Sequence, residues 1–195
     1  MAMLHARALK FGLIASIGLL VVACGGSAPE TFDLSAASVP EAHKLRAQIA
    51  IREPLTSLDL DSQRILVRTS PETVAYLTGA QWSDRLPTLI QTRLVQTFQN
   101  AHLLGSVGRA GAGFSSNYSL ELDVRAFELD AKSVQANVDI AAKIVDDRGG
   151  RIVASRIFTM QVPSAGTGGA QASVALNAAL SAVMAQIVAF TAASM

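Results

Sequence analysis

Residues 118–124 read Tyr-Ser-Leu-Glu-Leu-Asp-Val, and this stretch decides the fold because apolar side chains alternate strictly with polar ones. A two-residue period is the mark of a β-strand that buries one face. The period shifts after Ala126, since Phe127 and Leu129 are the next large apolar residues. We therefore expect one long strand that contains a β-bulge near Ala126.

Further strands lie on both sides of this one. Apolar residues alternate again over residues 134–144, and a third strand is predicted over 152–162 after a turn at 146–150. Short turns between successive strands predict an antiparallel meander. Shorter strands are expected earlier in the chain, at 45–51, 65–69 and 73–77.

A helix is predicted before the meander and should end near Asn100. Ser83 or Asp84 can serve as its N-cap, and either choice places Pro87 in the first turn, where a missing N–H costs least. An apolar stripe repeats every four residues and would face a sheet: Leu86, Ile90, Leu94 and Phe98, with Leu89 beside it. The segment 105–113 that follows is rich in glycine, and we interpret it as a flexible connector.

The chain ends with a second predicted helix at 170–192, and no charged residue follows Arg156. The predicted core face holds Val174, Leu180, Val183, Met184, Ile187 and Val188. The outer face combines Ser173, Asn177, Ser181 and Gln186 with alanines, namely Ala175, Ala178, Ala179, Ala182, Ala185 and Ala189. An outer helix normally carries charge, so this face indicates a protein interface. The same apolar length could serve a membrane span, but the interrupting polar residues favour the interface.

These elements predict an α+β fold: a mainly antiparallel sheet with two helices packed on one face. Among the outer alanines, Ala178, Ala182 and Ala185 are our candidates for the interface of a homo-oligomer. The alternative occupant of that face is a different protein.

The N-terminus has the pattern of an export signal. A basic stretch precedes an apolar run from Phe11 to Val22, and residues 21–24 read Val-Val-Ala-Cys. This sequence resembles the lipobox of bacterial lipoproteins, which implies cleavage between Ala23 and Cys24 and acylation of Cys24. The alternative is a stray thiol or an intermolecular disulfide, since Cys24 is the only cysteine. By resemblance to lipoprotein sorting signals, Gly25 after the cysteine favours the outer membrane, on its periplasmic side, over retention in the inner membrane.

Three segments follow from this interpretation: a signal peptide at 1–23, a flexible tether at 24–44 and one domain at 45–195. Arg7 and Lys10 leave with the signal, so 16 basic residues fall to 14, and against 15 acidic ones the net charge becomes −1. No basic patch is present to bind phosphates, which argues against nucleic acid as a partner.

Signals for catalysis are weak. Of the three histidines, His5 lies in the signal, His43 in the tether and His102 at a helix end, and no pair has the spacing of metal ligands. No serine lies in a Gly-x-Ser-x-Gly elbow. The 105–113 glycines lie between a helix and a strand, whereas a phosphate loop follows a strand and opens a helix. We expect no enzyme activity, no catalytic residue, no metal and no cofactor.

Residues 76–87 hold the only tryptophan: Tyr-Leu-Thr-Gly-Ala-Gln-Trp-Ser-Asp-Arg-Leu-Pro. This segment and the later Tyr-x-Leu-x-Leu-x-Val-x-x-Phe strand resemble the ABC-type transport auxiliary lipoprotein family, the PqiC-like group. Tyr76, Trp82 and Asp84 are candidates for a partner surface. The alternative is that Trp82 is a packing anchor where a strand meets a helix.

The resemblance implies a role beside an ABC permease, an ATPase and an MCE-type substrate-binding protein, which together move lipids between the two membranes and maintain the envelope. It also allows a ring-shaped homo-oligomer. Two other functions stay open: an outer-membrane assembly lipoprotein that partners a β-barrel, as in lipopolysaccharide export, and a periplasmic hydrolase.

Overall fold

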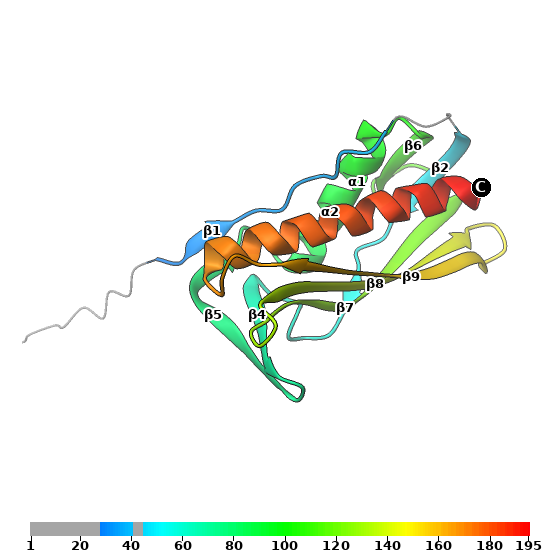
Figure 1. Cartoon of the computed structure of the whole chain (residues 1–195). Coiled ribbons are helices and arrows are strands. Elements are labelled where there is room, and N and C mark those ends of the chain that lie inside the picture. Colours follow the sequence, from blue (N-terminus) through cyan, green and yellow to red (C-terminus); the bar gives the residue numbers. More distant parts are fainter. Residues whose placement is uncertain (1–27, 41–44) are drawn as a thin grey trace, which may run out of the picture.

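The computed structural model describes residues 28–40 and 45–195, and two helices lie on one face of a nine-stranded sheet (Figure 1). Ala23, Cys24 and His43 fall outside the described residues. The helices are α1 (Leu86–Asn100) and α2 (Gly169–Ala193). The strands are β1 (Glu30–Phe32), β2 (Leu45–Ile51), β3 (Leu55–Thr56), β4 (Arg64–Ser70), β5 (Thr73–Trp82), β6 (Leu104–Arg109), β7 (Tyr118–Asp130), β8 (Gln135–Asp146) and β9 (Arg151–Pro163).

The predicted meander is confirmed. β7 pairs antiparallel with β8, and β8 pairs antiparallel with β9. The register of β7 shifts between Val124 and Ala126, so the predicted bulge is present. Because of this shift, Leu122 and Val124 before it and Phe127 after it all lie buried beneath the helices. Val134, expected within a strand, has a φ of 52° and lies in the turn before β8.

The sheet is mixed, so the prediction of a mainly antiparallel sheet is wrong. The second edge of β7 pairs with three short strands in succession, β2, β3 and β4, and all three run parallel to it. β6 is parallel to β2, and β1 is parallel to β5. The alternation of side chains defines the buried face of each strand but not the direction of its neighbour. The long β7 therefore joins an antiparallel half to a largely parallel half.

The glycine-rich segment is not only a connector, because its first part is the strand β6. Glycine is depleted in strands, which explains the wrong prediction. At Gly108 the reason for glycine is close packing: a Cβ there would lie 2.7 Å from Cε1 of Phe114. β6 therefore keeps its place at the sheet edge with an aromatic ring against its backbone.

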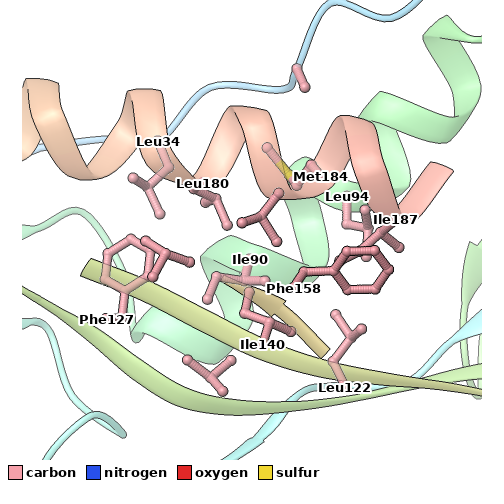
Figure 2. Packing of buried hydrophobic residues seen from close by; sticks show 14 of the residues in the cluster. Leu34, Ile90, Leu94, Leu122, Phe127, Ile140, Phe158, Leu180, Met184 and Ile187 are labelled. Carbon is pink, nitrogen blue, oxygen red and sulfur yellow. The ribbon is translucent and has the colours of Figure 1, made fainter. Parts of the chain in front are cut away.

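The core lies between the helices and the sheet. Ile90 and Leu94 of α1 belong to one buried cluster with Phe127 and Ile140 of the sheet (Figure 2). From α2, Leu180, Met184 and Ile187 point into the same cluster. The predicted core face of α2 is correct except for Val174, whose side chain is 71% exposed. Its side chain points outward between the buried residues Ser173 and Ala175 and does not pack in the core.

Arg85 is the N-cap of α1, not Ser83 or Asp84 as predicted, and no side-chain hydrogen bond caps the helix. Asp84 instead accepts a hydrogen bond from the Arg85 amide at 2.6 Å. The Ser83 amide donates to the carbonyl of Phe32 at 2.7 Å. The residues before α1 are thus held by β1, outside the capping position.

The segment 30–40, which the sequence places in a flexible tether, packs on the domain. β1 adds to the edge of β5, and Leu34 and Ala37 are buried against the helices. The brief strand suggested by Phe32 and its neighbours is present as β1. The tether prediction is therefore wrong for residues 30–40, which we call the arm.

Candidate interaction surfaces

Within the part of the chain that the structure describes, no three His, Cys, Asp or Glu side chains lie together in a way that could hold a metal ion. His102 follows the end of α1 and is exposed, with a φ of 49°. The candidate functional features of the described chain are surfaces that could bind another macromolecule.

The three candidate residues of the 76–87 segment have different environments. Trp82 is 1% exposed and its ring meets that of Phe127 edge-on, with centroids 5.8 Å apart. This burial corrects the choice of Trp82 as a surface residue and agrees with the packing-anchor alternative. Tyr76 is half-buried, and Asp84 is exposed.

Tyr76 is held from two sides, although it lies near the surface. Its hydroxyl donates to the carbonyl of Asp59 at 3.2 Å, and the guanidinium carbon of Arg64 lies 3.4 Å from the ring centroid. A cation at this distance over an aromatic face is attracted by the ring. Tyr76 therefore fixes the loop before β4 to the β4–β5 hairpin, and only part of its ring is open to a partner.

A charged cluster surrounds the start of α1 beside Asp84. Arg85 forms ion pairs with Asp61 and Glu53, the latter with nitrogen and oxygen 3.1 Å apart. The hydrogen bond to Asp61 raises the pKa of the Arg85 guanidinium above its ordinary value, together with the charges of both carboxylates. These pairs are exposed, so they order the surface more than they stabilise the fold.

The outward stripe of α2 contains no charge. Its exposed or half-buried residues are Gln171, Val174, Ala178, Ala182, Ala185, Gln186, Ala189 and Ala193. All three alanines chosen from the sequence lie on it, whereas Ser173, Ala175 and Ala179 are buried on the sheet side. By length and composition α2 could cross a membrane, but 56% of its most apolar window is buried inside the fold. In this structure α2 is a core helix with one uncharged open side.

A second, largely apolar surface adjoins this stripe, and it was not predicted from the sequence. β9 pairs with β8 alone in the described part of the chain, so its other edge is free. A groove of about 390 Å³ joins that edge to α2 and is lined by Val162, Pro163, Ala165, Ala170, Gln171, Val174, Ala175 and Ala178. Both faces of β9 carry large apolar residues, and this pattern in the sequence could have indicated the surface. Ile152 and Ile157 are each more than half exposed.

The comparison with known families agrees with this geometry. The sequence model of the ABC-type transport auxiliary lipoprotein component matches residues 32–188. The chain belongs to this family. The match begins in the arm and ends in α2, so it covers the arm, the sheet and both helices.

Similar proteins support the assignment. A crystal structure of a Xanthomonas campestris protein from the family DUF330 superposes with a TM-score of 0.79 at 27% identity, covering 85% of this chain and 95% of that one. A crystal structure of an uncharacterised protein superposes with a TM-score of 0.67 at 12% identity, covering 85% of this chain and 99% of that one. This likeness shows only that the two proteins share a fold. An uncharacterised protein of Bradyrhizobium diazoefficiens is 30% identical over 86% of this chain. The chain spans 47% of that relative's length.

Proposed function

We propose that this protein is the lipid-anchored, periplasmic auxiliary component of an MCE-type ABC transporter that moves lipids between the inner and outer membranes. The observation that carries the proposal is the family match over residues 32–188. The lipobox that ends at Cys24 supports a lipid anchor, and Gly25 after the cysteine favours the outer membrane. The partners would be an MCE-family substrate-binding protein, a permease and an ATPase. The stripe of α2 and the groove between α2 and β9 are suited to binding protein, since the residues that line them are mostly apolar and carry no charge.

The test of this role is a deletion combined with a pull-down from detergent-solubilised membranes. Loss of the protein should raise sensitivity to detergents and disturb the lipid asymmetry of the outer membrane. The tagged protein should retain an MCE protein. Recovery of a β-barrel in its place would favour the assembly-lipoprotein alternative, and unchanged permeability without an MCE partner would contradict the transport role. The genes beside this one give an independent check.

The anchor is tested at Cys24. In the lipidated protein the thiol is consumed in a thioether, so mass spectrometry should find acyl chains on a chain that begins at Cys24. The substitution Cys24→Ser should leave an unprocessed, unlipidated precursor. A correctly processed variant that still fractionates with outer membranes would refute lipidation at this residue.

We also propose a homo-oligomer that buries the stripe of α2, with the adjoining β9 edge at its border. Ala182 and Ala185 are half-buried, and their small side chains allow another backbone to approach closely. Ala182→Glu with Ala185→Glu should dissociate the oligomer while the monomer stays folded, because an uncompensated carboxylate is costly in an apolar interface.

The matched control is Gln99→Glu with Asn100→Glu, which adds the same charge at exposed positions of α1. Sedimentation of the delipidated protein reports the mass, and circular dichroism reports the fold. A wild type that is monomeric at micromolar concentration and binds no MCE protein would refute the interface.

A further inference from the structure

The arm runs along α2 from the first turn of the helix toward its C-terminal half. At its start, Phe32 lies beside Gly169, where an added Cβ would lie 3.2 Å from the Phe32 ring. The Ser35 amide then donates to Oδ1 of Asn177 at 2.7 Å. Figure 1 shows the arm in blue beside the whole first half of α2. Its first residue, Glu30, therefore lies at the N-terminal end of α2.

Several contacts hold the arm in this place. The Ala37 amide donates to Oγ1 of Thr97 at 3.0 Å, and both residues are buried. Leu34, 2% exposed, fills a site between the helices and the sheet. Asp33 forms an ion pair with Arg93 of α1. Burial of apolar side chains combined with satisfied backbone amides makes the arm part of the folded domain.

This packing shortens the link between the domain and the lipid. A free tether from Cys24 to Leu45 would span 21 residue steps and reach about 70 Å, which is longer than α2. With the arm packed, only the six residue steps from Cys24 to Glu30 link the lipid to the domain. Fully extended, this link spans at most about 20 Å. The far end of α2, 25 residues along, lies about 37 Å beyond its first turn. The lipid can thus approach one end of the domain and not the other.

The loop from Ser164 to Gly168 and the turn at 131–134 share this near end, because the Ser164 amide donates to the carbonyl of Val134 at 2.9 Å. The loop leads directly into α2 beside the start of the arm. The opposite end holds the α2 C-terminus with a pocket whose lining carries charges of both signs, from Arg46, Arg148 and Asp146.

We propose that the packed arm orients the domain on a phospholipid membrane, with the N-terminal end of α2 and the 164–168 loop toward the headgroups and the C-terminal end of α2 away from them. The inference rests on the lipid anchor of the proposed function and on no property of the transporter. The arm acts as the orienting device because it leaves the lipid too little chain to reach the C-terminal end of α2.

The test uses the lipidated protein in vesicles of phosphatidylethanolamine and phosphatidylglycerol that contain a nitroxide-headgroup phosphatidylcholine. Cys24 is the only cysteine, and in the lipidated protein its thiol is consumed in a thioether, so Thr167→Cys or Ala193→Cys supplies a single thiol for a fluorophore. Both positions are exposed, one at each end of α2. The label at position 167 should lose most of its fluorescence to the short-range quencher, and the label at position 193 should lose little.

The control is an insertion of about 20 Gly and Ser residues between Ser27 and Ala28, which adds a flexible reach of roughly 25 Å. With the insertion the difference between the two labels should disappear. Equal quenching without it, or stronger quenching at position 193, would overturn the proposal. So would a difference that survives the insertion, because the arm would then not be the cause. The mass of the protein reports separately on the anchor, and no transporter is present in the assay.

Discussion

Truncation of Trp82 to alanine should remove a large part of the stability of the domain. The side chain is 1% exposed at the junction of β5 and α1, and its ring packs at 70° to that of Phe127. Losing a buried aromatic side chain to alanine costs about 3–5 kcal/mol, since burial is lost and a cavity remains. Of this, roughly 0.5–1.5 kcal/mol belongs to the edge-on aromatic pair.

Urea unfolding of the delipidated chain, followed by far-UV circular dichroism, measures the free energy of unfolding without relying on the tryptophan signal. Trp82→Phe is the conservative control, and it should cost about 1–2 kcal/mol because most of the cavity stays filled. A double-mutant cycle with Phe127→Leu should give a coupling of about 0.5–1.5 kcal/mol.

The result that would refute this reasoning is a loss below about 1 kcal/mol in Trp82→Ala. If such a variant also failed to bind its partner while folded, Trp82 would belong to an interface and not to the core.

Two further predictions concern the arm. Gly169→Ala should destabilise the chain by about 1–3 kcal/mol, because its Cβ would lie 2.5 Å from the Cβ of Ala80, whereas Gly166→Ala makes only ordinary contacts and should be near neutral in urea unfolding. Partial burial acts to raise the pKa of Asp33, but the hydrogen bonds from Arg93 and from the backbone outweigh it and hold the pKa below its ordinary value. The contribution of Asp33 to the stability of the folded domain is therefore present above pH 3.8 and is lost as the pH falls further. Between pH 6 and pH 2.5 the free energy of unfolding of the wild type should fall by up to about 1 kcal/mol more than that of Asp33→Asn. An equal fall in both proteins would contradict the prediction.

The helices and the meander were predictable because each follows from a local period of apolar residues. The bulge near Ala126 was visible for the same reason, since one extra residue shifts the phase of the pattern. The stripe of α2 was visible because an outer helix without charge is unusual. In each case the information lies within a few neighbouring residues.

The parallel half of the sheet was not predictable in this way. β2, β3 and β4 are short, and each gains its place from a different part of β7: Ile49 pairs with Tyr118, Leu55 with Asp123 and Leu66 with Glu128. The direction of such pairs depends on where the chain travels between them, which no single strand encodes. β6 was missed because glycine disfavours a strand, whereas Gly108 is required there by the close approach of the Phe114 ring.

The arm was misread for a related physical reason, and the consequence is functional. Its composition of Ser, Ala and Pro cannot bury enough surface to fold alone, which is the property of a linker. Yet β5 offers an open edge to Phe32, and the groove between the helices offers Leu34 a buried site. A segment with weak structure of its own becomes ordered when neighbouring elements supply the hydrogen bonds and the apolar contacts. Order in residues 30–40 then limits how far a lipid on Cys24 can lie from the domain, so this packing, together with the few residues between Cys24 and Glu30, sets the orientation that the quenching experiment measures.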